Sequence, residues 1–182
     1  MNDLSLHILD VAQNAVAAGA GKITVSVCDE KGGVRRIEVC DDGCGMSAEM
    51  LARVTSPFAT GRQSRRVGLG VPLFKLAAEL TGGYLRVESE QGKGTRLTAV
   101  LMTGHIDCPP LGDMGGTMAL LIGQNPGIRF VYRRRAARGA FRFDTDALRQ
   151  ELSDVPPGCF EVQTFISAFI NDNEKELVEV HQ

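Results

Sequence analysis

No run of apolar residues in the sequence is long enough to cross a bilayer, which takes about 20 of them. The sequence also lacks the basic-then-apolar leader of a secreted protein ahead of its first helical pattern. A formal net charge of -2 gives no general attraction to nucleic acid or to an anionic membrane. These absences favour a cytoplasmic protein with no membrane partner.

A Cys-x-x-Cys pair is also missing, although the chain has five cysteines. In the cytoplasm such thiols stay reduced. Cys28 and Cys40 fall in expected strands, where a free cysteine usually acts as a small buried hydrophobe. A metal site on Cys40 and Cys44 is disfavoured, because no second close pair accompanies them.

The first 104 residues carry both helical and strand patterns. Apolar residues at steps of three and four predict helices at 4–18, 47–54 and 72–80. Alternating apolar and polar residues predict two hairpins, with strands at 22–28, 34–40, 84–90 and 95–102. This order predicts an α+β fold, a two-layer α/β sandwich with an antiparallel-rich sheet and helices on one face.

The segment 105–113 marks an expected boundary, because Pro109 and Pro110 can continue neither a helix nor a central strand. We therefore expect two units, 1–104 and 105–182. The second is predicted as a small α-β-β-α-α appendage of unknown role, with elements at 114–124, 128–135, 139–144, 145–152 and 160–170.

The hairpin of this appendage concentrates positive charge within 14 residues, on Arg129, Arg133, Arg134, Arg135, Arg138 and Arg142. Such a patch suits nucleic acid. The more ordinary interpretation is a solvated basic face of a hairpin. Because the net charge is negative, nucleic acid is an unlikely partner.

The first helix carries a polar stripe beside its apolar one. The apolar stripe consists of Leu4, Ile8, Val11, Ala15 and Ala18. His7, Asp10 and Asn14 follow the same spacing and share a face. A solvated helix face more usually carries Glu, Lys and Arg, so the stripe is either the lining of a pocket or an ordinary exposed strip.

Three glycine-containing stretches each fit nucleotide binding only weakly when taken alone. DDGCGM (41–46) lets a flat ligand approach beside a carboxylate, but it also suits a strand-to-helix turn. RVGLGVPLF (66–74) places two glycines before a helix N-terminus, which suits phosphate, yet it does not match G-x-G-x-x-G. GKGT (92–95) lacks the other features of a P-loop and is otherwise a hairpin turn.

In this order and spacing, the stretches resemble the GHKL superfamily of ATP-binding domains, named after gyrase, heat-shock chaperones, histidine kinases and MutL. The resemblance covers about residues 4–102. The N-box of the family resembles LDVAQNAVAAGAG, its next box resembles DDGCGM, and its last box resembles GKGT. The two ends of the family's ATP lid resemble SPFATGR and VGLGVPL. The resemblance implies the Bergerat-type fold, with ATP and Mg²⁺ as cofactors. The nucleotide-site residues that it implies are Asn14, Asp41, Gly43, Gly45, Met46, Phe58, Thr60, Arg62, Gly68, Leu69, Gly70 and Thr95.

The resemblance also gives the polar stripe a role. Asn14 would bind the Mg²⁺ that bridges the triphosphate, Asp41 would accept from the adenine amino group, and Thr95 would lie beneath the adenine. In the gyrase and MutL branches an acid four residues before the asparagine orients the attacking water, which makes Asp10 the candidate catalytic residue.

Two departures from the family pattern, and the polar residues near the expected site, qualify this assignment. Asp10 stands where the family usually has glutamate and is one methylene shorter, so a site-lining acid without a catalytic role is the alternative. Ala17 replaces a second acid that is typical of MutL. His7 is expected to be hydrogen-bonded or solvent-facing. Arg62 is expected on a phosphate, with Arg65 and Arg66 solvated.

We therefore expect a Mg-ATP-binding module, a regulatory protein switched by ATP and ADP, with slow hydrolysis and an unidentified protein partner. The alternative is a protein kinase of the anti-sigma type, acting on a partner's serine, threonine or histidine. Neither His105 nor His181 has the context of a phosphoacceptor, and no transducer or chaperone middle domain is recognised. The sequence predicts neither the partner nor the oligomeric state.

Overall fold

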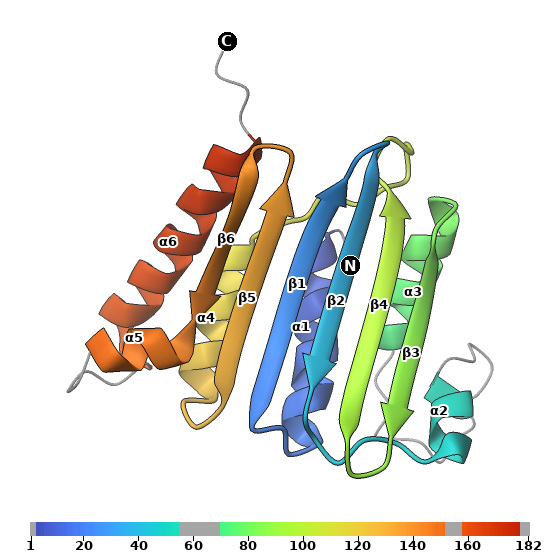
Figure 1. The fold of residues 1–182 in the computed structure, drawn as a ribbon, viewed down its shortest axis with the longest axis horizontal. Helices are drawn as coiled ribbons and strands as arrows, with labels where there is room; N and C mark the ends of the chain where they lie inside the picture. Colours follow the sequence, from blue (N-terminus) through green and yellow to red (C-terminus); the bar gives the residue numbers. More distant parts are fainter. Residues whose placement is uncertain (1–2, 55–69, 152–157, 179–182) are drawn as a thin grey trace.

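Strands from both halves of the sequence form one β-sheet in the computed structural model (Figure 1). The structure describes residues 3–54, 70–151 and 158–178. The strands in these ranges are β1 (Lys22–Glu30), β2 (Val34–Asp41), β3 (Tyr84–Glu90), β4 (Gly94–Met102), β5 (Arg129–Ala136) and β6 (Gly139–Asp144). The helices are α1 (Leu4–Ala17), α2 (Ala48–Val54), α3 (Gly70–Leu80), α4 (Met114–Gln124), α5 (Thr145–Glu151) and α6 (Phe160–Val178). Of these helices, none combines the length and the apolar character that crossing a membrane requires.

The sheet has the order β3-β4-β2-β1-β5-β6, and its one parallel pair within the described residues joins β1 to β5. In that pair Ile23 lies opposite Phe130 and Val27 opposite Arg134. Because β1 lies between β2 and β5, the chain after residue 104 continues the sheet that the first part begins. The division into units 1–104 and 105–182 stays a prediction, and the two units share this sheet.

The helices α1, α3, α4 and α6 lie on one face of the sheet, and no described helix covers the other (Figure 1). The alternation along the strands follows from this arrangement. Val25 and Val27 of β1 are buried beneath the helices, whereas Ser26 between them is partly exposed. The observed fold confirms the predicted α+β class, its two layers, and the α-β-β-α-α order of the second part.

Helix α1 shows why the predicted elements form where they do. Asp3 caps its first turn by accepting a hydrogen bond from the Leu6 amide at 3.1 Å. The helix ends at Ala17 because Gly19 adopts a positive φ of 73°, which glycine tolerates best. The other boundaries agree with the prediction to within two residues, except that α6 continues to Val178.

The two strand cysteines are less buried than expected. Cys28 and Cys40 are half-buried, because both lie on the sheet face that no described helix covers. Partial burial raises the pKa of the Cys40 thiol.

Candidate nucleotide-binding site

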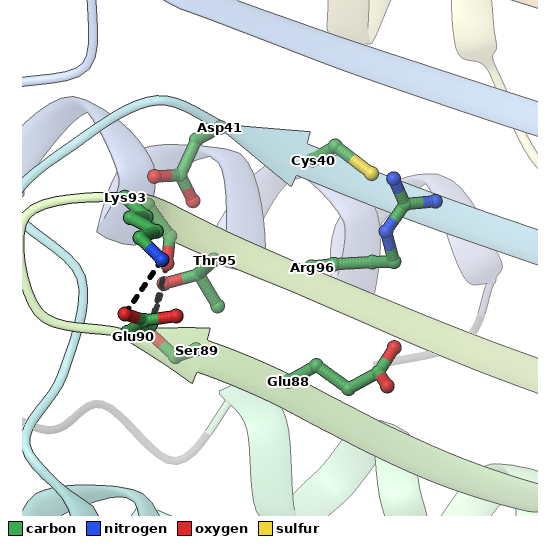
Figure 2. A pocket seen from close by; sticks show the side chains of 9 residues that line it. Cys40, Asp41, Glu88, Ser89, Glu90, Lys93, Thr95 and Arg96 are labelled. Carbon is green, nitrogen blue, oxygen red and sulfur yellow. Dashed lines mark hydrogen bonds and ion pairs between the residues drawn. The ribbon is translucent and has the colours of Figure 1, made fainter.

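A pocket of about 350 Å³ opens where β2, β3 and β4 meet at one end of the sheet (Figure 2). Asp41 at the end of β2 pairs in register with Thr95 of β4, which in turn pairs with Ser89 of β3. The complete lining is Cys40, Asp41, Glu88, Ser89, Glu90, Lys93, Gly94, Thr95 and Arg96. Strand alternation places Cys40, Glu88 and Arg96 on the helix-free face, whereas Asp41, Ser89 and Thr95 point to the helix side, so the pocket extends around the end of the sheet.

Asp41 is the half-buried carboxylate of this pocket. Its Oδ1 accepts a hydrogen bond from the Gly43 amide at 2.9 Å. Burial raises the pKa of Asp41, and the Gly43 and Thr95 amides oppose that rise by favouring the charged form. The two amides fix the orientation of the carboxylate, whose further lone pairs can still accept from a ligand donor such as an exocyclic amine.

Glycines allow the backbone around Asp41 to pack directly on the β3–β4 hairpin. A Cβ on Gly45 would lie 2.1 Å from the carbonyl oxygen of Glu90, and one on Gly94 would lie 2.0 Å from that of Asp41. Gly43 is similarly confined, because its Cβ would lie 2.9 Å from the carbonyl oxygen of Ala18. These three glycines therefore have a structural role in closing the end of the pocket.

The polar residues of α1 lie beside the first residue of α3. A Cβ on Gly70 would lie 2.7 Å from the Cβ of Asp10, so α1 and α3 approach each other closely at this point. Asp10 is half-buried and Asn14 is exposed. No described residue makes a hydrogen bond to either side chain, which leaves their oxygens available to water, an ion or a ligand.

Residues 2–104 match the family described as "Histidine kinase-, DNA gyrase B-, and HSP90-like ATPase". The chain belongs to this ATPase family. The resemblance found in the sequence is therefore confirmed, and with it the Bergerat-type fold and a domain that binds ATP. The stretch that resembles the N-box lies on α1, and the described part of the stretch that resembles the glycine box, from Gly70 on, begins α3.

Two relatives illustrate how far the similarity extends. Sporulation kinase D of Bacillus subtilis is 37% identical over 98 residues, which is 52% of this chain and 19% of that protein. DNA mismatch repair protein MutL of Pelotomaculum thermopropionicum is 42% identical over 169 residues, 85% of this chain and 27% of that protein. The chain thus spans about a quarter or less of these relatives.

Solved structures extend the comparison to the fold. A structure of the N-terminal domain of a DNA repair protein has a TM-score of 0.52 at 14% identity, covering 79% of this chain and 52% of that one. Full-length ShkA in complex with AMPPNP has a TM-score of 0.44 at 27% identity, covering 56% of this chain and 22% of that one. The first likeness supports the fold of this chain and nothing further.

The structure brings together two groups of the residues expected in the site. Asp41 and Thr95 line the pocket, and Gly43, Gly45 and Met46 contact lining residues. Asp10 and Gly70 meet at the α1–α3 contact. Their contacts with a nucleotide stay predictions. The expected lid residues Phe58, Thr60, Arg62, Gly68 and Leu69 lie outside the described residues, as do Arg65 and Arg66.

Sequence reasoning missed Ser89, which connects several parts of the pocket. Its hydroxyl donates to the Gly94 carbonyl at 2.9 Å, accepts from the Met46 amide at 2.8 Å, and lies 3.0 Å from Thr95 Oγ1. The hairpin register could have revealed it, since Ser89 lies directly opposite Thr95. Ser89 therefore orients the threonine expected beneath the adenine.

The expectation for His7 was wrong. Its side chain is neither solvent-facing nor hydrogen-bonded through Nδ1, since the residue is 3% exposed and that atom has no partner among the described residues. The ring stacks on Phe74 of α3 at a centroid distance of 5.0 Å. Burial lowers the pKa of His7, so the ring is neutral near pH 7.

The six arginines of the second part do not form the single solvated face that was expected. Arg134 is buried on the helix side of the sheet, where it pairs with Asp29 at 2.5 Å and with Glu174 at 2.8 Å. Arg129 and Arg142 both pair with Asp144. Strand alternation places Arg134 inward, and its two acidic partners stabilise the charge there.

Proposed function

We propose that the protein is a cytoplasmic regulator that binds Mg-ATP, hydrolyses it slowly and passes its nucleotide state to a protein partner. The observation that carries the proposal is the oriented, half-buried carboxylate of Asp41 in the pocket at the sheet end. The Gly43 and Thr95 amides hold the carboxylate, and its further lone pairs can accept from a ligand N–H. This arrangement supports recognition of the adenine amino group.

Magnesium fits the residues of α1. The described residues include no cluster of three or more His, Cys, Asp or Glu that could enclose a metal ion. Mg²⁺ usually needs few protein ligands when nucleotide phosphates supply the others. The exposed carboxamide of Asn14 has no hydrogen bond within the described part of the chain and would provide such a ligand. The bound ion would neutralise the charge of the triphosphate.

Asp10 would orient the attacking water. It lies one helical turn before Asn14, so both side chains reach the same side of α1. The close contact with Gly70 places Asp10 at the start of α3, where free amides favour phosphate. Because the aspartate is short, we expect slow turnover.

The extent of the MutL similarity supports hydrolysis and switching over phosphotransfer. It covers 85% of the chain and thus continues into the strands and helices after residue 104. The similarity to sporulation kinase D covers 52%. That second similarity is the observation that favours the alternative function, a kinase that transfers phosphate to a serine, threonine or histidine of a partner.

Incubation with γ-labelled ATP separates the two proposals. We expect wild-type protein to release labelled phosphate slowly, and Asp10→Asn to reduce that rate about 10²–10⁴-fold while ATP still binds, as for loss of a general base. Asp107→Asn removes the same charge from an exposed residue far along the chain and serves as the control. Label transferred to a protein in cell extract would favour the kinase, whereas unchanged hydrolysis by Asp10→Asn would exclude Asp10 from the mechanism.

A further inference from the structure

Strand β6 forms a free edge of the sheet. It pairs with β5 on one side and, among the described residues, with no strand on the other. Figure 1 shows this edge at one end of the molecule, with α6 beside it. A free edge presents unpaired backbone N–H and C=O groups, which can bind another extended segment.

The helix-free face beside this edge carries positive charge without partners. Arg133 of β5 lies directly opposite Arg142 of β6, and of these two arginines only Arg142 has an acidic partner within the described residues, Asp144. Within the described ranges, no acidic side chain forms an ion pair with Arg133, Arg135 or Arg138, and all three are exposed.

Arginines elsewhere on the same face are neutralised by neighbours. Three pairs account for them: Arg36 with Glu30, Arg96 with Glu38, and Arg86 with Glu88. The arginines without an acidic partner on this face are therefore concentrated on the β5–β6 hairpin, although the chain as a whole is negative.

The helix-covered side of the same edge carries exposed aromatic rings. Phe165 and Phe169 of α6 are 53% and 38% exposed and stack at 6.0 Å. Phe169 also contacts Phe143 of β6 at a ring distance of 5.9 Å. Helix α4 contacts a different side of α6, through Ser167 and Asn171. The two rings therefore lie on a flank of α6 that α4 leaves uncovered.

We propose that the β6 edge binds an extended segment of a partner protein in which acidic and apolar residues alternate. An added strand would point alternate side chains to opposite faces of the sheet. Its acidic residues would face the arginines of the hairpin, and its apolar residues would cover Phe165 and Phe169. Arginine suits this role because its guanidinium binds carboxylates in two-point contacts.

Two other occupants fit the surface less well. A second copy of the chain would bring its own surplus of arginines, and the nearby Asp144 is already paired with Arg129 and Arg142. Single-stranded nucleic acid is usually held by bases stacked on aromatic rings. Here Tyr132 and Phe143 alternate with the exposed arginines and lie on the opposite, helix-covered face.

This inference adds the chemistry of the partner to the proposed function. It rests on the proposed function only in taking that partner to be the one that receives the nucleotide state. Its test needs no nucleotide. A failure of peptide binding would therefore leave the ATP site untouched, and a failure of ATP binding would leave the β6 edge untouched.

The test measures binding of dye-labelled peptides of about eight residues, near the usual length of a strand. In one peptide glutamate alternates with valine, and in the control lysine replaces glutamate. We expect the acidic peptide to bind wild-type protein and the basic one not to bind. Arg133→Glu should weaken binding about fivefold or more, with a loss that shrinks at high salt. Phe165→Ser should also weaken it.

Arg86→Glu is the matched control, because it makes the same change on the same face at the far edge strand β3. It should leave peptide binding unchanged. Equal binding of both peptides, or an Arg133→Glu variant that binds like wild type, would overturn the proposal. Two other results would also overturn it. One is binding of duplex DNA that depends on Arg133 while the acidic peptide does not bind, and the other is a dimer in solution that Arg133→Glu disrupts.

Discussion

Replacing Glu174 by alanine should strongly destabilise the docking of α6 on the sheet. Glu174 accepts from Arg134 Nε at 2.8 Å, and its other oxygen accepts a short hydrogen bond from the Tyr132 hydroxyl. Both partners are fully buried on β5. The substitution would leave the hydroxyl without that acceptor and the guanidinium with Asp29 as its remaining acidic partner.

The magnitude follows from these contacts. Breaking a buried ion pair by removing one partner costs about 3–5 kcal/mol. The remaining Asp29 pair reduces that cost, while the unpaired tyrosine hydroxyl adds about 1–3 kcal/mol. We therefore expect a loss of about 3 kcal/mol in the free energy of unfolding, which lowers Tm by roughly 6–12 °C for a protein of this size.

Urea and thermal unfolding followed by circular dichroism would measure the change. Glu176→Ala is the control, because Glu176 is exposed on the same helix and should change stability by less than about 0.5 kcal/mol. If Glu174→Ala unfolds within about 1 kcal/mol of wild type, the buried network does not hold α6 on the sheet, and the reasoning is refuted.

Three further predictions concern the site and the helix contact beside it. Asp41→Asn should weaken ATP binding by about 1–3 kcal/mol, measured by calorimetry, and unchanged affinity would contradict adenine recognition by this carboxylate. Because burial raises the pKa of Asp41, wild-type ATP affinity should fall on acidification at a higher pH than for an ordinary carboxyl. His7 has a lowered pKa in the folded protein, so its contribution to stability is present above the unfolded value of 6.5 and is lost as the pH falls below it. In urea unfolding at several pH values, His7→Phe should remove this loss of stability at low pH. A pH profile equal to that of wild type would contradict the role of His7.

Local patterns predicted the elements well, because hairpins and capped helices depend on neighbouring residues. Alternating apolar and polar residues predicted both hairpins of the first part, and the structure confirms them. Asp41 and Thr95 lie directly opposite each other in the sheet, and their contacts with adenine stay predictions. The contact between Asp10 and Gly70 also agrees with the motif order, although their roles stay predictions.

Long-range contacts were the part that sequence patterns could not predict. No residue pattern in β1 or β5 indicates that the two strands pair in parallel. From the hairpin sequence alone, Arg134 was expected on the solvated face. Its burial depends on Glu174, which lies on a helix much later in the chain. His7 was misjudged for the same reason, because the ring that covers it belongs to α3.

The place of β1 between β2 and β5 has a consequence for synthesis. β1 is made roughly 100 residues before β5, so its second edge stays open until the ribosome has produced most of the chain. An open edge of this kind favours pairing with other chains. A shortened protein that ends near residue 104 would keep its ATPase motifs but expose this edge permanently, and it would be prone to aggregate. The later strands thus protect the earlier ones from association.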